Sequence, residues 1–362
     1  MSSHLLIHQK SYKTTLLGFL LACLGILNIS LAQSLDTRPT LQELLLIKEQ
    51  LTKQSMAGDH KASARLGAIY LSGSLGMPDY IRARKYLKLG SDVDLSARLA
   101  YGHLLMNGLG GSVDKLTAEH EFRKASEAGS NEGLYLASKL MLSRSSSLSE
   151  KEIAFKGIIN TAESGFPPAI FSVAEFYRTG SFVKKDSAMA EKLFLKSASR
   201  GFHEGYSKAA EMNLFGELGE IKKDQAVELY RLALSKGVIS SSYPLAYLLY
   251  YDKQSTEDHL LEAFRISETA ALSWDGRCQY LLGLMYYEGK ATDINYGESL
   301  FWLELAASAG VFESHHLRSL VSEKLSENET KLTRARAYEW FQANHDTPHK
   351  HLFIRDSQHV FP

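Results

Sequence analysis

The sequence predicts an all-α fold, an α/α solenoid of about seven helix-turn-helix repeats of roughly 36 residues, flanked by helical caps. The string Leu-Gly-x-x-Tyr-x-x-Gly stands at Leu66–Gly73 and again at Leu282–Gly289. Degraded copies lie between them, and the seven copies start 35 to 37 residues apart, at Leu66, Tyr101, Leu136, Val173, Ala209, Leu245 and Leu282. A near-constant period of this length indicates units that each bury an apolar face against the next unit.

A second set of positions repeats in phase with the first. A small residue follows each start by 17 or 18 positions: Ala83, Ala118, Ala154, Ala190, Ala226, Ala263 and Ser299. Eleven residues after it, five of the seven units have a glycine: Gly129, Gly165, Gly201, Gly237 and Gly310. Two offsets that recur together favour a true repeat over a chance match.

Each unit is expected to hold two helices. In the first helix of the first unit, Leu66, Ile69 and Tyr70 have the spacing of one helix face. The glycine that closes the string, such as Gly73, predicts the end of that helix. The second helix often opens on an acid suited to an N-terminus, at Asp79, Asp114, Glu150 and Asp186.

The third and sixth units follow the pattern least well. Their turns, residues 143–149 and 252–258, lack the usual glycines. One interpretation is sequence drift in exposed loops. The other is that these loops interrupt the curvature of the array or contact a partner.

The segments around the array are expected to be caps and ends. Residues 33–61 should form an N-terminal capping helix, residues 62–310 the seven repeats, and residues 311–345 C-terminal capping helices, because terminal repeats must expose one face to water. Residues 346–362 are expected to form a flexible tail.

Residues 1–32 have the pattern of a secretory signal peptide. Lys10 and Lys13 precede an apolar run at 16–27, and the small residues Ser30 and Ala32 predict cleavage after Ala32. The run is short for a membrane span, which needs about 20 apolar residues. An uncleaved anchor and lipidation at Cys23 remain alternatives. The expected location is the periplasm, with no membrane span in the mature chain.

The charge balance and the cysteine content argue against nucleic-acid binding and against stabilisation by disulfides. The chain has 41 basic and 41 acidic residues, and loss of the leader removes only Lys10 and Lys13, leaving 39 against 41. This balance argues against nucleic acid as a ligand. Beyond Cys23 the only cysteine is Cys278, so the mature chain can form no internal disulfide. Cys278 is interpreted as a packed, inert thiol, with a redox or intermolecular role as the alternative.

No catalytic motif is visible. The sequence has no phosphate-binding glycine loop, no G-x-S-x-G elbow and no H-E-x-x-H, so neither an enzyme nor a cofactor nor a metal site is expected. A cluster of four histidines, His345, His349, His351 and His359, is either a metal site or pH-responsive arm, or a solvated tail. The second interpretation is preferred because no cysteine or carboxylate stands at a fixed spacing from them.

The pattern resembles the SEL-one-like repeat family, 36-residue relatives of tetratricopeptide repeats. The last unit matches best, at Leu282, Gly283, Tyr286, Gly289, Asp293, Trp302, Ala306, Ala307 and Gly310. The resemblance implies a right-handed superhelix with a concave groove and a scaffold or adaptor role. A cysteine-rich subfamily credited with binding or hydrolysing β-lactams is not a model here, because its repeat disulfides are absent.

The groove of such a solenoid is expected to be lined by first helices, at or near the position that follows the small residue. The candidate partner-binding residues are His103, Ser138, Glu175, Glu211, Tyr247, Tyr251 and Leu284. This series passes from acidic to aromatic, which would suit an extended basic and apolar peptide. The sequence therefore predicts an exported, non-enzymatic scaffold that binds protein partners. An envelope polysaccharide or cell-wall factor, with a glycan as ligand, is the alternative.

Overall fold

The computed structural model describes residues 40–344 and contains only helices in that range. The prediction of an all-α repeat solenoid is confirmed. The predicted leader and the histidine tail lie outside the described residues. The chain divides into two compact units, one up to Phe176 and one from Tyr177 onward. Below, "first unit" and "second unit" mean these two parts, each of which contains several of the seven repeats.

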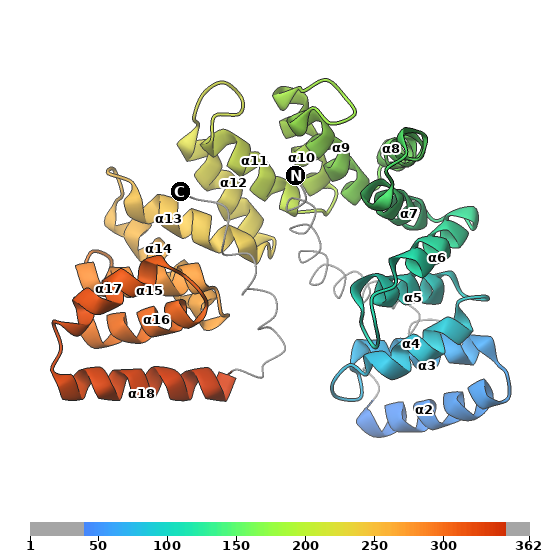
Figure 1. The fold of residues 1–362 in the computed structure, drawn as a ribbon, viewed down its shortest axis with the longest axis horizontal. Helices are drawn as coiled ribbons and strands as arrows, with labels where there is room; N and C mark the ends of the chain where they lie inside the picture. The colour runs from blue at the N-terminus through green and yellow to red at the C-terminus, as the bar shows by residue number, and fades with distance from the viewer. Residues whose placement is uncertain (1–39, 345–362) are drawn as a thin grey trace. The chain divides into compact units, whose positions relative to one another are not determined.

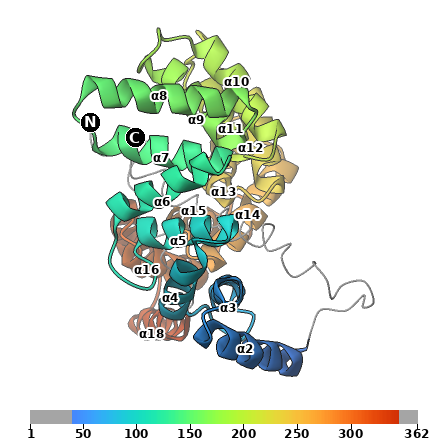
Figure 2. The ribbon, with the colours of Figure 1, turned by 90° about the vertical axis from the view of Figure 1, so that its right-hand side faces the viewer.

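The first unit begins with α2 and continues through three complete helix pairs (Figures 1 and 2). Its helices are α2 (Leu41–Met56), α3 (His60–Ser72), α4 (Tyr80–Gly90), α5 (Leu95–Asn107), α6 (Lys115–Glu127), α7 (Asn131–Arg144), α8 (Leu148–Glu163) and most of α9 (Pro167–Thr179). Helix α2 packs on α3, where Leu51 meets Leu66 and Ile69 in one buried cluster.

The second unit holds the remaining helices. They are α10 (Ser187–Ser199), α11 (Glu204–Leu214), α12 (Lys223–Ser235), the 3-10 turn η2 (Ile239–Ser241), α13 (Ser242–Tyr251), α14 (Glu257–Leu272), α15 (Gly276–Glu288), α16 (Tyr296–Ser308), α17 (Glu313–Ser322) and α18 (Glu327–Asn344). Consecutive helices from α10 to α17 pack on one another, and α18 packs on α16, as Figure 1 shows.

The helix pairs follow the sequence period. Each of the seven starts lies in the first helix of a pair, from α3 to α15, and each small residue of the second register lies in the second helix. The third and sixth units, α7 with α8 and α13 with α14, form such pairs although their turns lack the usual glycines. Helix pairing therefore survives where the sequence pattern weakens.

The helix ends have the predicted chemistry at most positions. Asp79, Asp114 and Asp186 each cap a second helix by accepting a hydrogen bond from a backbone N–H three residues later. Glu150 does not, because α8 begins earlier and Ser147 is its cap. Gly289 ends α15 with a φ of 67°, a left-handed conformation that glycine adopts without steric cost.

Some repeats have a glycine directly after the start position, where the two helices of the repeat approach closely. A Cβ added to Gly102 would lie 2.6 Å from Cε1 of Phe122, and one added to Gly283 would lie 2.8 Å from Cγ of Leu303. Both partner side chains belong to the second helix of the same repeat. A larger side chain at these positions would therefore collide with the second helix.

An aromatic cluster fixes α18. The ring of Trp340 lies 4.8 Å from that of Trp274 and 6.3 Å from that of Phe301. Arg336 places its guanidinium 4.1 Å from the Phe301 ring centre and donates two hydrogen bonds, of 2.8 and 2.7 Å, to Glu298 of α16. Helix α18 thus closes the end of the second unit with both apolar and charged contacts.

Candidate functional site

The first unit holds three of the predicted groove residues, and two are buried. His103 is 3% exposed, and its Nε2 lies 2.8 Å from Oε1 of Glu132 in the first helix of the next repeat. Ser138 is also buried, facing Gly157 of α8. Glu175 of α9 is half-buried. His103 and Ser138 offer almost no surface to a partner, because they fill the contacts between helices.

The second unit holds the other four. Leu284 is buried in the core between α13, α15 and α16. Glu211 is half-buried and is contacted by two cations, since Lys208 bonds to it and Nη1 of Arg178 lies 3.8 Å away. Tyr247 is half-buried and Tyr251 is 45% exposed. Tyr251 is therefore the most accessible of the seven predicted residues.

Four tyrosines of the second unit form a surface that we call the tyrosine stripe: Tyr243, Tyr247, Tyr251 and Tyr280. The first three are spaced four residues apart on α13, so they share one helix face. The ring centres of Tyr243 and Tyr247 are 5.7 Å apart, and those of Tyr247 and Tyr251 are 4.5 Å apart. Tyr280 adds a ring from α15 and lies close to Tyr251, since burial first and then interaction with Tyr280 raise the pKa of Tyr251.

Burial affects the ionisation of several tyrosines in and beside the stripe. Burial raises the pKa of Tyr243, Tyr251 and Tyr280 above the ordinary value near 10. Neighbouring Tyr250 has a raised pKa for the same reason, and its hydroxyl donates a 2.7 Å hydrogen bond to Oε2 of Glu288. The stripe is consequently an aromatic surface on which the phenols of Tyr243, Tyr251 and Tyr280 are neutral at ordinary pH.

Charges differ between the two ends of the stripe. At one end the guanidinium of Arg277 lies 5.3 Å from the centre of the Tyr243 ring. Near the other end lies Glu288, which accepts a hydrogen bond from Tyr250. Burial raises the pKa of Tyr280, and the charges of Glu313 and Glu288, both exposed, add to that effect. Lys290 is nearby, with its ammonium 2.6 Å from the backbone oxygen of Tyr250. The arrangement suits a ligand with apolar and basic groups.

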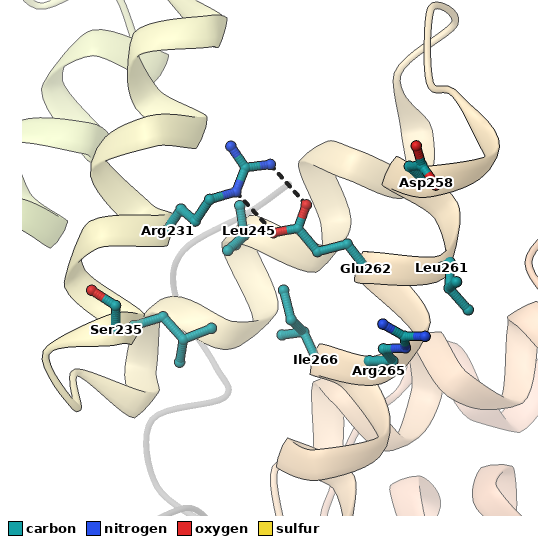
Figure 3. A pocket seen from close by; sticks show the side chains of 9 residues that line it. Arg231, Ser235, Leu245, Asp258, Leu261, Glu262, Arg265 and Ile266 are labelled. Carbon is teal, nitrogen blue, oxygen red and sulfur yellow. Dashed lines mark hydrogen bonds and ion pairs between the residues drawn. The ribbon is translucent and has the colours of Figure 1, made fainter.

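A shallow pocket lies between the second helices α12 and α14, away from the residues of the stripe (Figure 3). Arg231 of α12 and Glu262 of α14 close one side through two hydrogen bonds of 2.8 and 2.7 Å. The hydrogen bonds from Glu262 raise the pKa of Arg231. Asp258 and Arg265 line the far side. The pocket is best explained as a seam between repeats that is bridged by an ion pair.

Other chemistry is limited in the described residues. Within residues 40–344, no group of three or more His, Cys, Asp and Glu side chains is arranged to hold a metal ion. Cys278 is buried; burial raises the pKa of its thiol, and Asp275 adds to that effect, so the thiol is protonated. None of the helices described has the length and hydropathy needed to cross a membrane.

Solved structures show the same fold. A protective antigen of uropathogenic Escherichia coli strains, with an SLR fold, superposes with a TM-score of 0.63 at 18% identity, over 87% of this chain and 68% of the antigen. A Sel1 repeat protein from Oxalobacter formigenes gives a TM-score of 0.56 at 22% identity, over 79% of this chain and 82% of its own. No curated protein sequence matches the chain.

The Sel1 repeat family model matches five segments, residues 60–93, 95–130, 167–202, 203–238 and 276–311. Each segment coincides with one helix pair of the structure. The third and sixth units lie between the matches, as expected from their weak turns, and yet they have the same two-helix form. Seven helix pairs in phase with five matched repeats show that this chain belongs to the Sel1-like repeat family of helical repeat proteins.

Proposed function

We propose that this protein is an exported, non-enzymatic scaffold that holds an extended segment of a protein partner on the tyrosine stripe. The observation that carries the proposal is the exposed end of the stripe, where Tyr251 stacks within 4.5 Å of Tyr247 and remains 45% exposed. Sel1 repeats build surfaces for protein interaction, and this is the most aromatic surface along the first helices of the second unit.

Tyrosine suits this role for physical reasons. Its ring supplies a large contact area with few rotatable bonds, so little conformational entropy is lost on binding. Its hydroxyl can hydrogen-bond to the backbone of a bound peptide. Interface residues of this type contribute much of the binding energy when they lie in a cluster rather than singly.

The other predicted groove residues take different places in the proposal. Glu175 and Glu211 are acids that could attract a basic partner, although Lys208 and Arg178 already offset part of the charge of Glu211. His103, Ser138 and Leu284 act through packing. The proposal therefore rests on Tyr247 and Tyr251 as anchors, with the acids as secondary contributors.

Affinity capture from an envelope extract of the source cells tests the proposal. The full chain should retain a partner that the Tyr247→Ala, Tyr251→Ala double variant loses, because the anchors are gone. Tyr338→Ala is the matched control, since Tyr338 is 65% exposed on α18 and lies outside the stripe. Equal capture by the wild type and the double variant would remove the stripe from the mechanism.

A glycan is the second candidate ligand, because exposed tyrosine rings also stack on the apolar faces of sugars. Treating the captured material with protease and with glycosidase separates the two. Loss of the retained material after protease alone supports the protein partner. Loss after glycosidase alone supports an envelope polysaccharide.

Export is supported by the sequence of residues 1–32 alone, which lie outside the described residues. Cleavage after Ala32 predicts a mature protein that begins at Gln33. Mass spectrometry of the protein from a periplasmic fraction should find that N-terminus. A diacylglyceryl group on Cys23, or an intact leader, would replace the soluble periplasmic form with an anchored one.

A further inference from the structure

Helix α2 is the terminal helix of the first unit, and it packs extensively on α3 alone among the described helices (Figures 1 and 2). Its inner face carries the buried side chains Leu44 and Leu51. Terminal repeats of a solenoid normally turn a polar face to water. The outer face of α2 instead has two large apolar side chains, Leu46 and Met56, that are 68% and 80% exposed.

The outer face of α2 has the spacing of a coiled-coil seam. Five exposed residues follow one another at intervals of four, three, four and three: Gln42, Leu46, Glu49, Lys53 and Met56. This alternation averages 3.5 residues, which is the period that keeps side chains on one narrow stripe facing a second helix. We call these five residues the α2 seam.

The α2 seam is symmetric about position 51. Leu46 and Met56 lie on either side of this point, each about 7.5 Å along the helix axis, and Glu49 and Lys53 each lie about 3 Å from it. Two antiparallel copies related by a two-fold axis at this point would place Leu46 opposite Met56 of the second copy. They would also place Glu49 opposite Lys53 of the second copy. A two-fold interface requires a self-complementary surface of this kind.

The charges of α2 agree with such a pairing. Four charged side chains stand on the helix, and two of them lie off the seam: Glu43 accepts hydrogen bonds from Thr40 at the N-terminus, and Lys48 is on a half-buried flank. The other two, Glu49 and Lys53, form an ion pair of 2.9 Å with side chains that are 62% and 76% exposed. An exposed pair of this kind adds little to the stability of its own helix. Both charges can therefore turn to a second copy at little cost.

We propose that two copies of this protein associate through their α2 seams, packed antiparallel. Leu46 and Met56 remove apolar surface from water at both ends of the contact, while Glu49 and Lys53 set its direction at the centre. A parallel pairing would place like charges opposite one another at both central positions, so the charges select the antiparallel form. The symmetry of the seam favours a second copy of this chain over an unrelated helix.

The dimer is expected to be weak and reversible. Helix α2 has 16 residues and is about 24 Å long, so one pair of such helices buries less than the roughly 1,200–2,000 Å² of a stable interface. The protein is then a monomer when dilute and a dimer when concentrated. A dimer carries two tyrosine stripes and could hold two partner segments at once. That consequence rests on the proposed function, whereas the association itself does not.

Sedimentation velocity of the exported full-length protein, over a series of concentrations, tests the inference. Glu49→Lys and Lys53→Glu each place like charges opposite one another, so each variant alone should self-associate at least tenfold more weakly than the wild type. An equimolar mixture of the two variants should form a dimer about as readily as the wild type, because every central charge then meets its opposite. The control is Glu152→Lys, which disrupts the matching exposed pair of Glu152 and Lys156 on α8 and should leave association unchanged.

Three results would overturn the inference. A wild type that stays monomeric throughout the concentration series shows that the seam does not bind a second copy. Equal association of the wild type and both charge variants places the contact on another surface. Charge variants that remain monomeric when mixed contradict the antiparallel pairing of Glu49 with Lys53. None of these results affects the capture test of the partner, which depends on Tyr247 and Tyr251.

Discussion

Trp274 adopts a left-handed backbone conformation, with a φ of 71°, and stacks its indole 4.8 Å from that of Trp340. It stands eleven residues after Ala263, at the offset where five of the other units have a glycine. A bulky residue in this conformation is an outlier that costs about 1–2 kcal/mol. The contact with α18 offsets that cost. The sixth repeat therefore has a strained turn residue, Trp274, whose side chain holds α18 in place.

Replacing Trp274 tests whether its backbone strain or its aromatic contact has the larger effect on the free energy of unfolding. Trp274→Gly relieves the backbone strain but removes a side chain that is 5% exposed. Loss of a buried tryptophan costs about 3–5 kcal/mol, so the net expected loss is about 1–4 kcal/mol after the relief of strain. Urea denaturation measures it. A more stable variant would show that the strain outweighs the aromatic contact.

Two helix glycines of the seventh unit should respond to alanine in opposite ways. A Cβ at Gly283 would lie 2.8 Å from Cγ of buried Leu303, so Gly283→Ala should destabilise the chain by about 1–3 kcal/mol. At Gly297 the nearest atom is Oδ1 of Asn295 at 3.4 Å, and Gly297→Ala should be neutral or gain up to about 1 kcal/mol. Thermal unfolding of both variants checks the contrast. Equal effects would contradict the close approach of α15 and α16.

The buried carboxylate of Glu119 should matter more than an exposed one. Glu119 is 3% exposed and accepts hydrogen bonds from Arg144 at 2.6 Å and from Arg123 of its own helix at 2.8 Å, and the bond from Arg144 joins α6 to α7. Glu119→Gln should lower Tm by about 3 °C, since an amide loses the charge-assisted bonds. Glu152→Gln, in an exposed pair with Lys156, should leave Tm unchanged. Calorimetry that gives equal Tm shifts for the two variants would refute the bridge.

Stability should fall in alkali because of buried tyrosines. Burial raises the pKa of Tyr230 well above 10, so above that pH the unfolded state releases this proton while the folded state keeps it. The contribution of this tyrosine to stability is therefore fully present below pH 10. It is lost as pH rises, by about 1.4 kcal/mol per pH unit for each such tyrosine. Urea denaturation at pH 9, 10 and 11 should show a smaller loss for Tyr230→Phe. Parallel curves for the two proteins would contradict the raised pKa.

The period of the sequence predicted the helix pairs, because each repeat position has one packing role. Gly102 and Gly283, each directly after a repeat start, both lie against the second helix of their repeat. The weakness of the third and sixth repeats was visible in their turns, which lack the usual glycines, and Ser147 and Thr256 cap their second helices. Helix starts with other capping residues are harder to place by pattern alone.

The position of a residue within the repeat predicted the groove-lining residues less well than it predicted the helices. His103, Ser138 and Leu284 follow the small residue of their helices, yet they are buried. A helix turns by about 100° per residue, so this position can face the next repeat as readily as the solvent. Contacts such as that of His103 with Glu132 depend on how neighbouring repeats stack, which one repeat pattern does not encode.

Two features were missed although signals for them existed. The tryptophan at the glycine offset of unit six was visible in the register of Ala263 and Trp274. The spacing of Tyr243, Tyr247 and Tyr251 at intervals of four also indicated a shared helix face. The apposition of Tyr280 required the structure, because it comes from the next repeat.

Photo-crosslinking in the source cells tests the binding surface most directly. A benzophenone amino acid placed at Tyr251 lies on the stripe, and one placed at Tyr338 is a control on α18 with greater exposure. The proposed function predicts a crosslinked protein of discrete mass from position 251 and none from position 338. Equal crosslinking from both positions, or none from position 251, would contradict a partner site on the tyrosine stripe.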